Sequence, residues 1–192
     1  GVAALKNKGS FFWCTANVPI LDYPATVAGE GNGEVLIEGI TMWGTSSTPV
    51  IDLDTFFGLS AIRNCNVIQS GTGGGVRIGW GATYELENNY IVGASYAVAT
   101  GLGNTRTGVG IDCAQGTRSA GLQIMRKNTV AGWHTCIKLG VTDAVGVYTY
   151  APAIDTCELA YYYIGVHFTN RCEAATLTKC YFEGQDEGFS VL

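Results

Sequence analysis

The chain has 192 residues, of which 47% are hydrophobic and only 14% charged, and its formal net charge is −5. This apolar content suffices for one substantial core and excludes a disordered chain. The sequence has no run of lysine and arginine, so we do not expect nucleic acid as a partner. No apolar stretch approaches the ~18 residues of a membrane-spanning helix, so we expect no insertion into a membrane.

Residues 1–33 are the least regular part of the chain and end in a glycine-rich connection at 29–33. We interpret them as the entry coil of a single domain, residues 1–192, whose repeated coils occupy 34–192. The 27 glycines and 4 prolines predict an all-β chain with frequent tight turns. Because a stack of coils exposes strand edges at its ends, we expect the chain to belong to a longer protein or to be covered by partner chains.

From residue 34 onward one short pattern recurs six times. Each copy reads apolar, polar, turn residue, Asn or Cys, polar, apolar, and the aligned first apolar residues are 25, 24, 39, 29 and 23 positions apart. Since a strand alternates faces with period two, both apolar residues should point inward on either side of a bend. The six copies are LIEGITM (36–42), AIRNCNV (61–67), ELENNYI (85–91), IMRKNTV (124–130), AIDTCEL (153–159) and TLTKCYF (176–182).

A second short alternating strand follows most copies about 11 to 14 residues later. Two or three short strands in ~24 residues are the period of one coil of a parallel β-helix. The sequence therefore predicts a single-stranded right-handed parallel β-helix, a solenoid of about six to seven coils. The second strands are VIDLD (50–54), VRIGW (76–80), VGIDC (109–113), CIKLG (136–140), VHFTN (166–170) and FSVL (189–192).

Two aligned positions support the predicted stacking of coils. The fourth position holds Asn or Cys, which we expect to stack inside a turn. The Asn side chains can satisfy buried backbone groups, and Cys is a compact apolar substitute. The second position faces outward and alternates in charge, so that opposite charges are neighbours. We interpret this second column as scaffold. The two columns are Cys65, Asn89, Asn128, Cys157 and Cys180, and Glu38, Arg63, Glu87, Arg126, Asp155 and Thr178.

The seven cysteines form no C-x-x-C pair, and only two histidines are present. We interpret the cysteines as buried reduced thiols, which suits synthesis in a reducing cytoplasm. With no cluster of ligands in the sequence, we expect neither a metal site nor a cofactor.

Three segments, LENNYIVGA (86–94), IRNCNVIQSG (62–71) and MRKNTVAGW (125–133), resemble right-handed β-helices of the pectate-lyase-like superfamily. The resemblance covers roughly residues 34–192, and bacteriophage tailspike depolymerases look nearest in character. It implies a homotrimer in the virion, at the phage tail, synthesised in the host cytoplasm. Its partner would be a bacterial surface polysaccharide, which it binds and can hydrolyse.

Two other functions stay open at this point, and the sequence does not decide whether the protein is an enzyme. One is a non-catalytic structural β-helical segment of a phage fibre or baseplate. The other is a secreted polysaccharide lyase or hydrolase. The Asn-Thr-Asp and Gly-His-Gly patterns typical of polygalacturonases are absent.

The outward residues of the second strands are the candidate catalytic groups, because glycoside hydrolysis uses two carboxylates. Alternation along the second strands predicts two outward-facing columns. The first contains Asp52, Arg77, Gly110, Lys138, His167 and Ser190. The second contains Asp54, Gly79, Asp112, Gly140, Thr169 and Leu192. In this alignment Asp54 and Asp112 lie two coils apart, ~9.6 Å at the usual strand spacing, as in an inverting acid/base pair. The second candidates are Asp52, Arg77 and His167.

Aromatic and basic residues near these columns are the candidate substrate-binding groups, because aromatic faces stack on sugar rings. They are Trp80, Lys138, Tyr148 and Tyr150. The alternative is that tryptophans close the corners of the coils and tyrosines line a subunit interface. The extra residues at 95–108, 114–121 and 140–152 are expected to form loops on one face, often the binding face of a solenoid.

Overall fold

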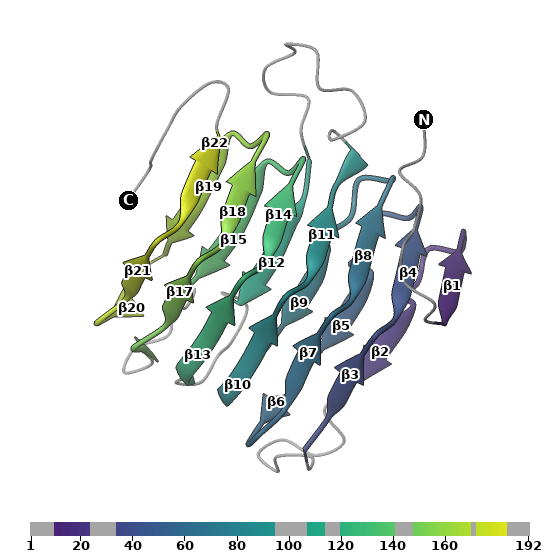
Figure 1. Ribbon diagram of the computed structural model, residues 1–192. Helices are drawn as coiled ribbons and strands as arrows, with labels where there is room; N and C mark the ends of the chain where they lie inside the picture. Colours follow the sequence, from purple (N-terminus) through teal and green to yellow (C-terminus); the bar gives the residue numbers. More distant parts are fainter. Residues whose placement is uncertain are drawn as a thin grey trace.

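A computed structural model describes residues 10–23, 34–94, 107–113, 120–140, 148–169 and 172–183. These residues form three sheets in which every neighbouring pair of strands is parallel. Strands of successive coils lie side by side in chain order, from β1 to β22 (Figure 1). The predicted all-β parallel β-helix is therefore confirmed. The strand predicted at 189–192 and most of the predicted loops lie outside the described residues.

Each complete coil places a strand in each of the three sheets, which we call A, B and C. Sheet A contains β1 (Phe11–Cys14), β4 (Thr41–Gly44), β8 (Asn66–Gln69), β11 (Tyr90–Val92), β14 (Thr129–Ala131), β18 (Glu158–Ala160) and β22 (Tyr181–Glu183). Sheet B contains β2 (Leu21–Tyr23), β5 (Ile51–Leu53), β9 (Val76–Ile78), β12 (Val109–Cys113), β15 (Thr135–Leu139) and β19 (Ile164–Phe168). Sheet C contains β3 (Leu36–Glu38), β6 (Phe56–Phe57), β7 (Ala61–Arg63), β10 (Gly81–Glu87), β13 (Ala120–Arg126), β16 (Thr149–Tyr150), β17 (Ala153–Asp155), β20 (Cys172–Glu173) and β21 (Thr176–Thr178).

The coils are numbered here by these strands. Coil 1 holds β1 and β2, coil 2 holds β3 to β5, and coil 3 holds β6 to β9. Coil 4 holds β10 to β12, coil 5 holds β13 to β15, coil 6 holds β16 to β19 and coil 7 holds β20 to β22.

The register of the six copies is the one that the repeat predicts. Ile62 pairs with both Ile37 and Leu86, although the copies are separated by different lengths of chain. The pairing continues through Met125, Ile154 and Leu177, and the second apolar residues pair in the same way from Met42 to Phe182. The extra 15 residues of the longest interval therefore leave the stacking intact, since 39 positions replace the 24 of the preceding one.

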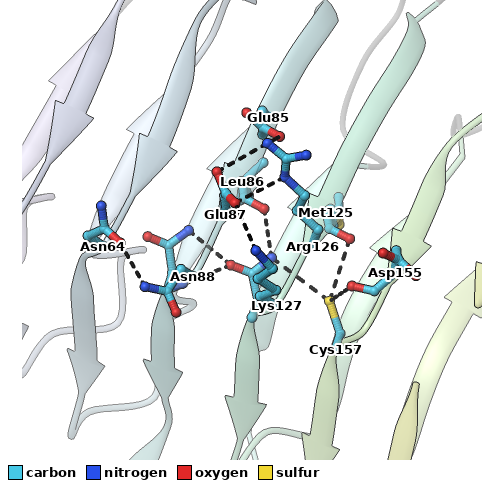
Figure 2. A network of polar contacts seen from close by, with 12 residues as sticks. Asn64, Glu85, Leu86, Glu87, Asn88, Met125, Arg126, Lys127, Asp155 and Cys157 are labelled. Atoms are coloured by element: carbon cyan, nitrogen blue, oxygen red, sulfur yellow. Dashed lines mark hydrogen bonds and ion pairs between the residues drawn. The ribbon is translucent and has the colours of Figure 1, made fainter. Parts of the chain in front are cut away.

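A left-handed backbone conformation marks the turn between sheets C and A in every copy. The φ angles of these residues lie between 51° and 68°. Asparagine and glycine tolerate this region well, whereas lysine and threonine occupy it at a cost. On the outer side of this turn, the side-chain amide of Asn88 donates to the side-chain oxygen of Asn64 at 2.7 Å (Figure 2). The column consists of Gly39, Asn64, Asn88, Lys127, Thr156 and Lys179.

A second column of left-handed residues bends sheet C itself, with φ between 47° and 66°. Its members follow directly on residues that pair from coil to coil. The sequence did not predict this bend because the residues at the position share neither size nor polarity. They are Gly58, Thr83, Leu122, Ala151 and Ala174.

Inside the first turn, the Asn and Cys side chains hold one coil to the coil before it. Asn89 Nδ2 donates to the carbonyl of Ile62 at 2.8 Å, and its Oδ1 accepts from the amide of Cys65 at 3.0 Å. The thiols of Cys65 and Cys157 donate to the corresponding carbonyls, at 3.6 and 3.5 Å. Cysteine thus takes over the donor role of the asparagine amide, whereas the repeat suggested only a compact apolar substitute. Cys157 is drawn with its Met125 contact in Figure 2.

Trp133 shows why some glycines occur at fixed places. Its side chain is buried, and its indole N–H donates to the carbonyl of Ile91 at 3.2 Å. A Cβ atom at Gly75, Gly93 or Gly110 would lie 3.2, 2.9 or 2.9 Å from this ring. The tryptophan therefore closes a corner of the coil, and the glycines of coils 3 and 4 make room for it.

Candidate functional site

The outer face of sheet B carries one continuous column of polar side chains. The strands pair so that each of these residues is the direct neighbour of the next, while Ile51 and Leu53 on either side of Asp52 point into the core. We call this set the sheet B column. Its members are Asp22, Asp52, Arg77, Asp112, Lys138 and His167.

This register corrects the predicted alignment of Asp112. Asp112 pairs with Arg77, because Ile111 pairs with Val76, and it does not lie in the column of Asp54 and Gly79. Gly110 consequently lies beside Gly75 rather than beside Arg77. A slip of two residues keeps every side chain on its predicted face, so alternation alone cannot detect it.

Arg77 joins two carboxylates on this face. Its guanidinium donates to Oδ1 of Asp54 at 2.8 and 3.2 Å, and its Nη1 lies 3.1 Å from Oδ1 of Asp52. The second contact lacks hydrogen-bonding geometry, so this buried oxygen of Asp52 has no hydrogen-bond partner. The side chain of Asp52 is 21% exposed, against 42% for Asp54. We call Asp52, Arg77 and Asp54 the carboxylate cluster.

The two ends of the sheet B column differ in electrostatics. Burial raises the pKa of Asp52 above its usual value; Arg77 opposes this shift, and the negative charges of Asp54 and Asp22 add to it. Burial also lowers the pKa of His167, and the positive charge of Lys138 lowers it further, while Asp112 acts the other way. Asp52 therefore holds its proton more tightly than a solvated aspartate, and His167 releases its proton more easily than a solvated histidine.

The predicted pair Asp54 and Asp112 is offset along the strand as well as across coils. Their backbones differ by two coils across the sheet and by two residues along the strand, which together amount to about 12 Å at ordinary strand dimensions. Asp52 and Asp112 lie two coils apart in the same column, about 9.6 Å between backbones. That separation is close to the range of about 6.5–9.5 Å between carboxyl groups in inverting glycosidases.

Trp80 and Tyr148, two of the predicted aromatic residues, lie at the corner between sheets B and C. Trp80 follows Gly79, where a Cβ atom would lie 3.0 Å from the carbonyl oxygen of Asp54. The carbonyl of Trp80 accepts from the amide of Phe56 at 2.8 Å. Tyr148 lies at the equivalent position two coils further on, since Thr149 and Tyr150 continue the register of β13 and β10. The rings of Tyr148 and Tyr150 are 5.7 Å apart.

The structure thus brings Asp52, Arg77, Asp112, Lys138 and His167 into one column and places Asp54 and Trp80 beside it. Tyr150 belongs to sheet C and lies apart from the sheet B column. Sequence reasoning missed Asp22, which extends the column on coil 1. The alternating pattern of Leu21 to Tyr23 is too short, in the irregular entry segment, to have identified it.

The described residues contain no group of three His, Cys, Asp or Glu side chains placed to hold a metal ion. All seven cysteines are free thiols. Burial raises the pKa of Cys113 to about 12 and that of Cys157 to about 11, so these thiols stay protonated and are poor nucleophiles. In the same part of the chain, no helix is long and apolar enough to span a membrane.

The fold places the chain in the class of parallel β-helix proteins. No protein-family model, no curated protein and no solved structure matches it. Any more particular function therefore has to be argued from the sheet B column and its surroundings.

Proposed function

We propose that the protein binds a polysaccharide across the outer face of sheet B and hydrolyses it with Asp52 as general acid and Asp112 as general base. The observation that carries this proposal is that two carboxyl groups, one of them with a raised pKa, lie two coils apart in the same column. The resemblance of the repeat to tailspike depolymerases adds a bacterial surface polysaccharide as the substrate and a homotrimer in the phage tail as the assembly.

The division of roles follows from the environments of the two groups. A general acid must carry its proton at the working pH, which the burial of Asp52 favours. It donates this proton to the glycosidic oxygen as the bond to the anomeric carbon breaks. Ionised Asp112 takes a proton from a water molecule, whose oxygen bonds to the anomeric carbon from the opposite face.

Arg77 and Asp54 have supporting roles in this mechanism. Arg77 donates two hydrogen bonds to the carboxylate of Asp54, which fix its guanidinium group. Arg77 then lies beside Asp52 and stabilises the carboxylate that remains after proton transfer. Trp80 and Tyr148, at the neighbouring corner, supply aromatic faces on which sugar rings stack.

The experiment is to incubate the purified full chain with bacterial capsule or lipopolysaccharide and to measure the size of the products. We expect shortening by the wild type and a loss of at least about 100-fold for Asp52→Asn, since general acid catalysis contributes about 10²–10⁴. Asp155→Asn, on the outer face of sheet C, is the matched control and should keep full activity. Products of an inverting hydrolase would appear first with inverted anomeric configuration, and an unsaturated, ultraviolet-absorbing product would instead indicate a lyase.

A structural, non-catalytic fibre segment is the second candidate, and one observation favours it. Arg77 already neutralises neighbouring carboxylates, as Arg126 does on sheet C with Glu85 and Glu87. If a folded trimer shortens no polysaccharide and Asp52→Asn alters only stability, this function replaces the first one.

A further inference from the structure

Lys138, a candidate substrate-binding residue of the sheet B column, has no role in the proposed hydrolysis. In the same column Arg77 lies beside two carboxylates, at 2.8 and 3.1 Å. No carboxylate of the described residues lies within 4.0 Å of the Lys138 ammonium group, although Asp112 is its neighbour in register. Among the described residues, the partly buried Lys138 therefore has no direct counter-ion on this face.

His167 is the neighbour of Lys138 on the next coil, and its pKa is sensitive to the charge of Lys138. The two residues pair directly between β15 and β19. The pKa of His167 is lowered first by burial and then by Lys138, and the opposing effect of Asp112 is smaller. Lys138 therefore has a larger effect on His167 than the carboxylate of Asp112 has.

The opposite end of the column is negative. On coils 1 to 3, Asp22 is the direct neighbour of Asp52, and Arg77 lies beside Asp52 and Asp54 at 3.1 and 2.8 Å. A uniformly anionic chain would be repelled from the carboxylates there, whereas an entirely neutral chain would leave Lys138 without a partner. The face is thus polarised along the axis of the β-helix.

We propose that Lys138 and His167 form an anion subsite for the carboxylate of an acidic sugar, so that the substrate is a mixed polysaccharide. Its acidic unit lies on coils 5 and 6, and its uncharged units lie over Asp52 and Asp112. This inference rests on the proposed function for the identity of the ligand as a glycan, but the subsite can be tested without hydrolysis. Lys138 supplies the charge, and the imidazole of His167 supplies an N–H donor.

The test uses the full wild-type chain and three probes: sodium D-glucuronate, D-glucose and inorganic phosphate. Nuclear magnetic resonance follows the imidazole signals of both histidines during each titration. We expect glucuronate to shift the His167 signals and to raise its pKa, because a bound carboxylate favours the imidazolium form. Affinity should therefore increase as the pH falls through the pKa of His167; the other groups that face it are Lys138, Asp112 and His134.

Matched variants locate the subsite. Lys138→Met should weaken glucuronate binding by about tenfold or more, as expected for the loss of a charge-assisted hydrogen bond. Lys179→Met makes the same change in the turn between sheets C and A and should leave the affinity unchanged. His167→Gln should bind glucuronate with little dependence on pH.

The outcomes separate this inference from the proposed function. Glucose that binds as well as glucuronate, phosphate as the one anion that binds, or equal losses in Lys138→Met and Lys179→Met would each refute the acidic-sugar subsite. Specific glucuronate binding by a protein that cleaves no polysaccharide would keep the subsite and refute hydrolysis. Cleavage of a wholly neutral polysaccharide without glucuronate binding would keep the proposed hydrolysis and refute the acidic-sugar subsite.

Discussion

The charged columns on sheets B and C use the same stacking but differ in composition and environment. On sheet C the charge alternates from Glu38 through Arg126 to Asp155, and Arg126 contacts Glu85 and Glu87 at 2.6 and 3.2 Å (Figure 2). On sheet B, Asp22 and Asp52 are neighbours of like charge, and burial raises the pKa of Asp52. A scaffold has no need of two carboxylates as direct neighbours, so the sheet B column is the one that calls for a functional explanation.

The largest effect should separate the two columns by activity. Asp112→Asn on sheet B should lower kcat by about 100-fold or more, because it removes the general base. Asp155→Asn on sheet C should leave kcat within about twofold of the wild type, since surface carboxylates away from the reaction contribute little. Steady-state measurement of released reducing ends checks both, and equal losses would place catalysis outside the sheet B column.

The next effect concerns the arginines. Arg77→Met should lower the free energy of unfolding by about 2 kcal/mol, because it removes the guanidinium that contacts two partly buried carboxylates. Arg126→Met should cost no more than about 1 kcal/mol, since this guanidinium is half exposed. Urea denaturation measures both values, and a greater loss for Arg126→Met would reverse our ranking of the two columns.

The dependence of stability on pH should have opposite signs for the two aspartates. The pKa of Asp52 is raised, so its ionisation destabilises the fold as the pH rises above the unfolded pKa. The hydrogen bond from Thr178 lowers the pKa of Asp155, so its contribution is present at neutral pH and is lost as the pH falls.

Thermal unfolding of two variants between pH 3 and pH 7 tests this difference in sign. Asp52→Asn should be stabilised relative to the wild type at pH 7 and equal to it at pH 3. Asp155→Asn should be destabilised at pH 7, and this difference should shrink as the pH falls toward the lowered pKa of Asp155. Two curves that shift in the same direction would contradict the assigned environments.

The smallest effect belongs to the scaffold column itself. Glu87→Gln removes the carboxylate that faces Arg126 and Lys127, at 3.2 and 3.6 Å. We expect a loss of about 0.5 kcal/mol that becomes negligible in 1 M salt, because exposed ion pairs are weak and are screened. A loss that persists in high salt would indicate that this column has a role beyond surface stabilisation.

Much of the fold was predictable because neighbouring coils repeat the same local chemistry. The register of Ile37, Ile62 and Leu86 follows from the pattern itself, and so do the stacked Asn and Cys residues. The candidate site was predictable in its residue types but not in its pairing. Asp112 follows a long insertion, and moving its strand by two residues leaves the predicted inward and outward faces unchanged.

The sequence by itself determined the repeat, the inward-facing residues and the turn that each copy makes, because these depend on alternation and on residues close together in the chain. The tertiary structure decided which charges are neighbours on sheet B, and therefore which carboxyl group has a raised pKa and which arginine joins two carboxylates. It also decided that Trp133 is buried against three glycines. Burial and cross-coil distances depend on contacts between segments far apart in the chain, which local patterns do not contain.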